Sequence, residues 1–466
     1  MFIGREKEIA LLQRKNWRDQ AELIVIYGRR RIGKTALVEE AYKDRICWKF
    51  EGLEGRSTRR QIRNFLFTIY QHTGNEAVIQ KQNSIKTWQE ALLLLDKEIG
   101  TGEYIIFFDE FQWMASMRTQ LVSTFKWAWD NYLQKHSNCK FVICGSISSF
   151  IVKKVLRSRA LYGRIDTEIN LKPFSLNETS AFFHGKRLAQ EVLEIYMAVG
   201  GVPQYLKVFE PEKSVAQNLC SLAFEPNGYF SKEYHRLFIS HFSSNEQYEK
   251  IVKFLALHGP QTRDALVKSL KTGNGGTFSN LLNDLTMAEF IEKVYPIDKH
   301  VGGRTLLLRQ YDEFLHFYFR LIFPNKTAIE TNTIKVYEQL TGPVYNQWRG
   351  YAFERLCRKH VKLIAKYLEF SGISFSFGSW FRKNEAQVDL LFKRADNVLT
   401  VCEMKYVERI KGVELIRTFE KKLAALQSVY NLPVQKVLIL GNQIDVPDKV
   451  FGYFDKVILF KDLVFT

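Results

Sequence analysis

The stretch Gly28-Arg29-Arg30-Arg31-Ile32-Gly33-Lys34-Thr35 fits the pattern G-x-x-x-x-G-K-[ST] of a phosphate-binding loop. It follows the apolar run 23–27 directly, and the segment 36–41 after it has the composition of a helix. Strand, glycine loop and helix are the context that such a loop requires, because backbone N–H groups must point inward around the phosphates. We therefore expect these eight residues to bind ATP, with Lys34 on the β and γ oxygens and the Thr35 hydroxyl on Mg²⁺.

Two carboxylates follow a second apolar run, residues 105–108, as Asp109-Glu110. The carboxyl end of a buried parallel strand is where such sheets bind ligands. We expect Asp109 to support Mg²⁺ through its water shell and Glu110 to act as the general base on the attacking water. The alternative, an acidic surface turn, is weakened by the phosphate-binding loop upstream.

Further polar positions follow a third apolar run, residues 141–144. Gly145-Ser146 comes directly after it, and Ser146 is a candidate sensor of the γ-phosphate. Arg157, Arg159 and Arg164 follow, and Arg164 is a candidate for a catalytic arginine that reaches the nucleotide of a neighbouring subunit in a homo-oligomer. An ordinary salt bridge explains Arg164 equally well.

Length and charge limit the class of protein. A chain of 466 residues predicts two to four domains. The net charge of +17 favours a polyanionic partner and a solvated basic surface about equally. The six cysteines have no C-x-x-C spacing, the first residues lack a signal-peptide pattern, and no apolar run is long enough for a membrane span. These features predict a cytoplasmic protein with reduced thiols and no membrane association.

The chain divides by pattern into five segments. Residues 1–174 alternate expected strands (23–27, 46–50, 104–108, 141–144, 167–171) with helices, which predicts a parallel α/β sheet covered on both faces. Residues 175–242 are helical, as expected for a lid. Residues 243–310 have three expected helices and two strands around Gly302-Gly303, a winged helix-turn-helix. An aromatic packing helix occupies 311–341, and a third α/β unit occupies 342–466.

Several motifs together resemble those of the archaeal-type ATPases, P-loop proteins of the AAA-like/STAND group. They are Phe2-Ile3-Gly4-Arg5-Glu6-Lys7-Glu8, the loop at 28–35, Asp109-Glu110, Leu161-Tyr162-Gly163-Arg164, Gly200-Gly201-Val202-Pro203 and the segment 312–324. The resemblance covers nearly the whole chain. It implies a P-loop domain, a winged helix and a C-terminal domain similar to PD-(D/E)XK nucleases, which have a restriction-endonuclease-like α/β fold.

The third unit contains a set of residues suited to phosphodiester hydrolysis. Asp389 lies in the expected strand 388–392. Glu403 and Lys405 lie in the run 401–405 of the next expected strand, on one side of it. We expect Asp389 and Glu403 to hold Mg²⁺ and Lys405 to orient or help deprotonate the attacking water. Glu354, on an expected helix at 351–368, matches the helical glutamate of that superfamily. The alternative is a surface salt bridge.

The candidates for nucleic-acid contact are less distinctive. The helix at 278–285, which would read DNA in a winged helix, has no lysine or arginine. A spacer or protein-binding role therefore explains it at least as well as DNA recognition. The arginines at 56, 59, 60 and 63 form a better basic patch, although a solvated helix face explains them slightly better.

These observations predict an ATP-hydrolysing protein coupled to a Mg²⁺-dependent nuclease domain that acts on DNA, in defence or in the processing of mobile elements. The competing hypothesis is a nucleotide-driven switch whose C-terminal domain binds DNA or protein without cleaving it.

Overall fold

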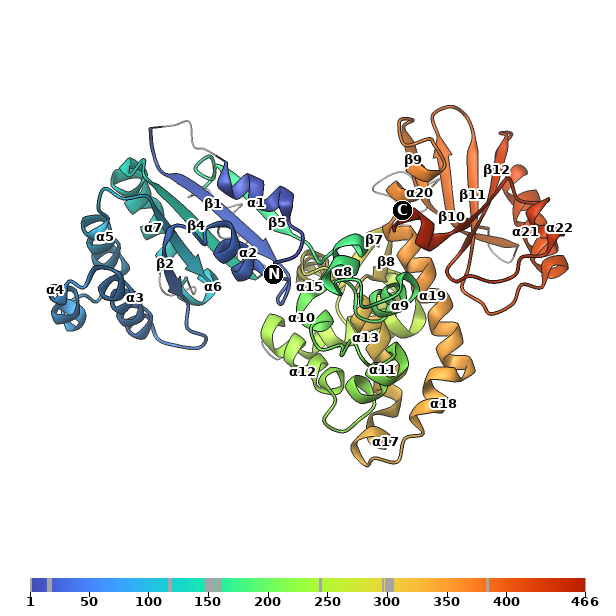
Figure 1. Cartoon of the computed structure of the whole chain (residues 1–466), viewed down its shortest axis with the longest axis horizontal. Coiled ribbons are helices and arrows are strands. Elements are labelled where there is room, and N and C mark those ends of the chain that lie inside the picture. Colours follow the sequence, from blue (N-terminus) through green and yellow to red (C-terminus); the bar gives the residue numbers. More distant parts are fainter. Residues whose placement is uncertain are drawn as a thin grey trace. The chain divides into compact units, whose positions relative to one another are not determined.

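The computed structural model describes residues 2–14, 19–115, 120–146, 155, 161–242, 245–295, 297, 306–382 and 385–465. The chain has two compact units, Met1–Pro173 and Phe174–Thr466 (Figure 1). The segments that the sequence pattern separates after residue 174 all lie in the second unit.

The first unit is built on a parallel five-stranded sheet with the order β2-β3-β4-β1-β5. Its strands are β1 (Glu22–Gly28), β2 (Ile46–Glu51), β3 (Tyr104–Asp109), β4 (Cys139–Ser146) and β5 (Thr167–Leu171). Every residue of β4 is buried because it lies in the middle of the sheet with both faces covered. The predicted parallel α/β sheet is confirmed.

Helices cover both faces of this sheet. One face packs against α3 (Thr58–Thr73), α5 (Trp88–Glu98) and α7 (Leu121–Asn131), and the other against α1 (Glu6–Gln13) and α2 (Lys34–Ala41). The short helices α4 (Glu76–Gln80) and α6 (Phe111–Met114) complete the unit. Thr87 and Glu90 form a capping box that starts α5, so this helix has a clear local start signal.

The second unit begins with the helices α8 (Leu176–Phe182), α9 (Ala189–Val199), α10 (Pro203–Leu206), α11 (Val215–Ala223) and α12 (Tyr229–Phe242). At the turn between α9 and α10, Gly201 lies so close to Phe174 that its carbonyl accepts the Phe174 N–H at 2.7 Å. Three further helices follow, α13 (Glu246–His258), α14 (Arg263–Leu270) and α15 (Gly276–Met287). They accompany an antiparallel sheet with the order β6-β8-β7, whose strands are β6 (Gln261–Thr262), β7 (Ile291–Val294) and β8 (Leu307–Gln310).

The aromatic segment is a buried packing helix, as expected. It consists of α16 (Glu313–Phe317) and a π-helical stretch, Tyr318–Ile322, whose aromatic side chains are buried. The stretch ends at Phe323-Pro324, and the short helices α17 (Lys326–Glu330) and α18 (Val336–Thr341) follow.

The C-terminal part contains a mixed five-stranded sheet with the order β13-β12-β11-β10-β9. Its strands are β9 (Phe375–Arg382), β10 (Ala386–Arg394), β11 (Leu399–Lys405), β12 (Val434–Leu440) and β13 (Lys456–Leu459). The β9–β10 and β10–β11 pairs are antiparallel, whereas β11–β12 and β12–β13 are parallel. The accompanying helices are α19 (Pro343–Lys359), α20 (Val361–Tyr367), α21 (Gly412–Gln427) and α22 (Asp448–Phe451). The expected single helix at 351–368 is therefore two helices, separated at His360.

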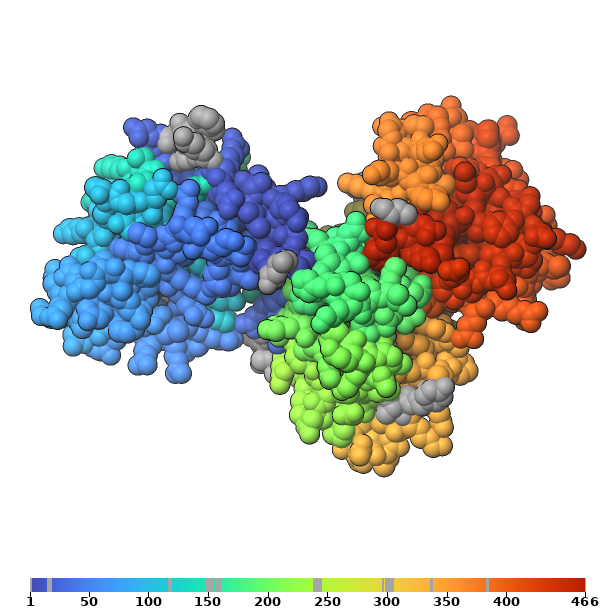
Figure 2. All heavy atoms as spheres, viewed as in Figure 1, coloured from blue at the N-terminus to red at the C-terminus, as the bar shows by residue number. Residues whose placement is uncertain are grey.

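The C-terminal part of the chain packs against the helices at the start of the second unit, as the red and green atoms show in Figure 2, and a buried contact joins the two. Tyr406 follows β11 directly, and its hydroxyl donates to Glu194 of α9 at 2.9 Å and accepts from Gln190 of the same helix at 2.8 Å. The guanidinium of Arg349 on α19 lies 5.2 Å from the centre of the Tyr406 ring.

All six cysteines are free thiols, and four of them are buried. Within the part of the chain that the structure describes, no helix is long and apolar enough to cross a membrane.

The close approach at Gly201 gives a prediction on stability. A Cβ at this position would lie 1.9 Å from the Phe174 carbonyl oxygen, a backbone atom that cannot move away freely. Gly201→Ala should therefore destabilise the second unit by about 1–3 kcal/mol, as overpacking does. Gly273→Ala is the matched control, since its Cβ would meet nothing within 4 Å. Thermal unfolding measures both, and equal midpoints would contradict the prediction.

Candidate functional sites

The phosphate-binding loop joins the end of β1 to the start of α2. Gly33 has φ 88°, in the left-handed region that favours glycine, so it is suited to the sharp entry into α2. A Cβ on Gly28 would lie 2.5 Å from the Leu171 carbonyl oxygen of β5, so the neighbouring strand requires glycine here. The Ile32 side chain is buried in the core beneath the sheet. Only the backbone of Ile32 is therefore available to a phosphate.

Lys34 is buried, and its ammonium group binds the loop itself. Its Nζ donates to the carbonyl oxygens of Gly28 at 3.1 Å and Arg29 at 3.0 Å. These neutral acceptors hold the charged nitrogen inside the curve of the loop. A phosphate entering the loop would meet a cation that is already in position.

The start of α2 and the end of β3 place a hydroxyl beside a carboxylate. The Thr35 hydroxyl at the start of α2 donates to Asp109 Oδ2 at 2.8 Å, and Asp109 is buried at the end of β3. Lys49 Nζ on β2 lies 3.7 Å from the same oxygen. Hydroxyl and carboxylate oxygens are ligands that Mg²⁺ prefers, so Thr35 and Asp109 fit the predicted metal role.

Glu110 lies between Asp109 and Ser146. Its backbone adopts φ 47°, and its N–H donates to Asp109 Oδ1 at 3.0 Å. Its Oε2 accepts hydrogen bonds from the Gln112 amide and, at 3.5 Å, from the Ser146 hydroxyl. Because β4 pairs with both β1 and β3, Ser146 lies between the loop and the two carboxylates. The structure thus brings all of these predicted residues to one edge of the sheet.

The arginines near this site differ in their surroundings. Arg29 is buried, and the Arg30 guanidinium lies 5.3 Å from the centre of the Trp113 ring. Arg31 has φ 70°. Arg164 donates from Nε and Nη2 to the two carboxylate oxygens of Asp130 at 2.5 and 2.9 Å, which is the salt-bridge alternative. Its action on a neighbouring subunit stays a prediction. Arg157 and Arg159 lie outside the described residues.

In the second unit, the four residues of the C-terminal candidate site come from three elements. Glu354 lies on α19, Asp389 on β10, and Glu403 and Lys405 on β11. Burial and, after it, the charge of Asp389 raise the pKa of Glu354 to about 7, against the opposing charges of Arg358 and Lys405. Residues far apart in the sequence therefore lie within electrostatic reach of one another.

Glu403 is buried between two lysines. Its Oε1 lies 2.8 Å from Lys405 Nζ, and its Oε2 accepts from Lys422 Nζ of α21 at 2.8 Å. Burial raises the pKa of Glu403, but the two ammonium groups outweigh burial and hold this pKa below its usual value. Lys422 was not predicted, because its contact with Glu403 depends on how α21 packs on the sheet.

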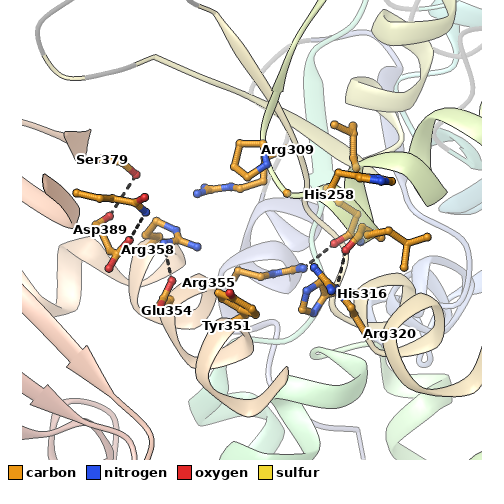
Figure 3. Close-up of a pocket in the computed structure, with 17 residues that line it drawn as sticks. His258, Arg309, His316, Arg320, Tyr351, Glu354, Arg355, Arg358, Ser379 and Asp389 are labelled. Atoms are coloured by element: carbon orange, nitrogen blue, oxygen red, sulfur yellow. Dashed lines mark hydrogen bonds and ion pairs between the residues drawn. The ribbon is translucent and has the colours of Figure 1, made fainter. Parts of the chain in front are cut away.

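Asp389 faces a separate set of partners. Its Oδ1 accepts from Gln387 Nε2 at 2.7 Å, and its backbone carbonyl accepts from the Ser379 hydroxyl at 3.3 Å. Asp389 and Glu354 both line a cavity of about 300 Å³ (Figure 3). Among the described residues, no group of three or more His, Cys, Asp or Glu side chains is arranged to hold a metal ion. A Mg²⁺ ion here would need water and phosphate oxygens to complete its shell, which is common for this metal.

Comparisons with known proteins address the first unit most directly. Residues 2–209 match a family model described as an ATPase domain predominantly from Archaea. Together with the sheet order and the loop geometry, this match supports a P-loop ATPase of the archaeal type, and most of the matched residues lie in the first unit, the ATPase domain. Residues 318–416, which include Glu354, Asp389, Glu403 and Lys405, match a model of archaeal and bacterial proteins of unknown function.

Two relatives and one solved structure are similar to this chain over different extents. An uncharacterized protein of Methanocaldococcus jannaschii is 29% identical over 401 residues, which are 84% of this chain and 84% of that protein. An uncharacterized ATP-binding protein of the same organism is 48% identical over 40 residues, 9% of this chain and 68% of that protein. The solved Walker-type ATPase of Pyrococcus abyssi covers 68% of this chain and 96% of its own, with a TM-score of 0.51 and 20% identity, which shows a shared fold.

The ATPase domain gives a prediction for two substitutions. Lys34→Ala should abolish hydrolysis and weaken ATP binding, because it removes the cation held at the loop. Glu110→Gln should bind ATP but turn it over roughly 100-fold more slowly, since the amide keeps the size of the side chain and loses its basicity. Phosphate release and nucleotide binding measure the two effects. Glu103→Gln, an exposed position before β3, is the control, and unchanged turnover in Glu110→Gln would exclude Glu110 as the base.

The pKa of Glu354 gives a prediction on the pH dependence of stability. This pKa is about 7 in the folded protein, against an ordinary value of 4.5. Between these values the folded state binds more protons than the unfolded state, so the free energy of unfolding falls as the pH rises from 4.5 to 7. Glu354→Gln should remove this slope, whereas the exposed Glu338→Gln should keep it. Unfolding midpoints in EDTA across this range measure the difference, and parallel curves would contradict the assignment.

Proposed function

We propose that the ATPase domain is coupled to a metal-dependent nuclease site on the C-terminal sheet that acts on DNA. One observation carries the proposal: the buried carboxyl group of Glu354 on helix α19 lies near enough to Asp389 of β10 and Lys405 of β11 for both charges to act on its ionisation. Buried charges are costly, so their concentration in one place favours a functional site over incidental salt bridges.

The roles follow from the charges of the residues. Asp389 and Glu403 would hold Mg²⁺, which lowers the pKa of a bound water and polarises the phosphodiester. Burial lowers the pKa of Lys405, but Glu403 more than offsets burial and raises this pKa, so Lys405 is protonated at neutral pH. Lys405 therefore suits the stabilisation of phosphate charge and the orientation of water better than the abstraction of its proton. Glu354 lies beside it as the carboxylate that would accept that proton.

Residues 243–310 are proposed to be a winged helix. The support is their order of helices α13, α14 and α15 followed by the small antiparallel sheet. The Asp284 carboxylate of α15 accepts from the Tyr248 hydroxyl of α13 at 2.9 Å, so it is engaged with the neighbouring helix. Asn280 and Asn283 are exposed, and Asn283 accepts from Lys293 at 3.2 Å. Gly302 and Gly303 of the expected wing lie outside the described residues.

The second candidate function is a nucleotide-driven switch whose C-terminal domain binds DNA or protein without cleaving it. The observation in its favour is that both carboxylate oxygens of Glu403 are occupied by lysines. A metal would have to displace at least one of these ammonium groups. A domain that only binds would keep this arrangement permanently.

A nuclease assay with Mg²⁺ or Mn²⁺, with and without ATP, on duplex and single-stranded DNA and RNA distinguishes the two functions. Asp389→Ala and Lys405→Ala should each slow cleavage by roughly 100-fold or more, through lost metal binding and lost charge stabilisation respectively. Both variants should hydrolyse ATP at the parent rate without nucleic acid, because their sites lie outside the ATPase domain. Asp396→Ala, an exposed residue paired with Arg394 in the same hairpin, is the control.

Two results would decide against the nuclease proposal. A parent protein that binds DNA but cuts no substrate under any condition supports the switch. Cleavage that survives both Asp389→Ala and Lys405→Ala shows that the cutting comes from another site or another protein.

A further inference from the structure

The cavity beside Glu354 and Asp389 is lined by more positive than negative side chains. It lies between the end of α13, strand β8, the aromatic segment, helix α19 and the β9–β10 pair (Figure 3). Its cationic lining consists of Arg309, Arg320, Arg355 and Arg358. Glu354 and Asp389 are the only carboxylates in the described lining.

Three of these arginines form hydrogen bonds, two of them only to neutral groups. Arg355 donates to Gln310 Oε1 at 2.5 Å and to the Tyr311 carbonyl oxygen at 2.9 Å. Arg320 Nε donates to the Ala256 carbonyl oxygen at 2.9 Å. Arg309 forms hydrogen bonds to a carboxylate, Glu292, at 2.7 and 2.9 Å. Neutral acceptors therefore fix the guanidinium groups of Arg355 and Arg320, whereas Arg309 is paired with Glu292.

Arg358 is the least satisfied of the four. Its Nε is buried and has no hydrogen-bond partner among the described residues, and its Nη1 lies 3.6 Å from Glu354 Oε2. Burial and the charge of Arg309 together lower the pKa of Arg358 to about 10. In Figure 3 the guanidinium groups of Arg309 and Arg358 lie near each other. Buried like charges repel, so an anion between them would relieve a cost that the free protein carries.

We propose that this cavity binds a phosphate group through Arg358, Arg309 and Arg355. A guanidinium presents paired N–H donors that match phosphate oxygens, and charge-assisted bonds of this kind are strong in a buried site. The phosphate belongs either to a nucleic acid strand or to a free phosphate ester. The assignment to a nucleic acid rests on the proposed function, since a bound nucleic acid would place a backbone phosphate beside Glu354 and Asp389.

A neighbouring cavity favours a nucleic acid as the source of the phosphate. It has a volume of about 560 Å³, shares Arg309, Arg358 and Ser379 with the first, and adds Lys359 and Lys362. Positive side chains thus continue from one cavity into the next, as a polyanion with repeated phosphates requires.

The first test measures thermal unfolding with inorganic phosphate against chloride at equal ionic strength, without nucleotide. Phosphate should raise the unfolding midpoint of the parent protein by about 2–4 °C. Arg358→Gln should lose this rise without lowering the midpoint in chloride, because it removes a charge that has no hydrogen-bonded anion. Arg382→Gln, an exposed arginine on β9, and Lys34→Ala, at the phosphate-binding loop, should both keep the rise.

Three results would overturn the phosphate site. The first is that phosphate does not raise the unfolding midpoint of the parent protein, and the second is that it still raises the midpoint of Arg358→Gln. The third is that it no longer raises the midpoint of Lys34→Ala, which would place the phosphate in the ATPase domain. If Arg358→Gln unfolds at a lower midpoint in chloride, Arg358→Lys decides the question. Arg358→Lys keeps the charge and loses the paired N–H donors. If phosphate raises its unfolding midpoint as much as in the parent protein, the proposal is contradicted, and a smaller increase supports it.

The second test identifies the source of the phosphate. The anisotropy of a labelled single-stranded oligonucleotide measures binding in EDTA, where no metal-dependent cleavage occurs. An affinity reduced about tenfold in Arg358→Gln but not in Arg382→Gln assigns the cavity to a nucleic acid strand. An unchanged affinity assigns it to a free phosphate ester. Because neither readout needs cleavage, the phosphate site and the nuclease proposal can fail separately.

Discussion

The pairing of β4 with both β1 and β3 is the constraint on which the nucleotide site depends. Parallel strands present their carboxyl ends at one edge, so the phosphate-binding loop, Ser146 and the Asp109-Glu110 pair meet there. The hydrogen bond from Thr35 to Asp109 crosses the width of β4. A different strand order would leave the same motifs intact and separate the groups that must act together.

The two candidate sites share a way of holding charge in the free protein. Lys34 is bound by carbonyl oxygens of its own loop, and Glu403 is bound by two lysines. In both places the charged group is already positioned, and a ligand would exchange one set of partners for another. Arg358 is different, because its Nε is buried without a hydrogen-bond partner in the described part of the chain.

Much of the fold was predictable from the sequence because its signals are local. The loop at 28–35, the apolar run before Asp109 and the strands around Asp389 and Glu403 are each encoded within about ten residues, and their elements are confirmed. Contacts between distant segments had no such signal. Lys422 reaches Glu403 from α21, and Arg309 of β8 approaches Arg358 of α19, through packing that no spacing in the chain reveals. The break between α19 and α20 at His360 was missed as well, since no proline or glycine marks it.

The Tyr406 contact has a mechanical consequence for the C-terminal sheet. Tyr406 follows Lys405 directly in the chain, and its hydroxyl is tied to Glu194 and Gln190 on α9. A hydrogen bond tolerates only a few tenths of an ångström of stretch before it weakens. Any displacement of α9 must therefore either break two bonds at a buried ring or pull the end of β11 with it. A movement of helix α9 would in this way be transmitted to the backbone of Lys405.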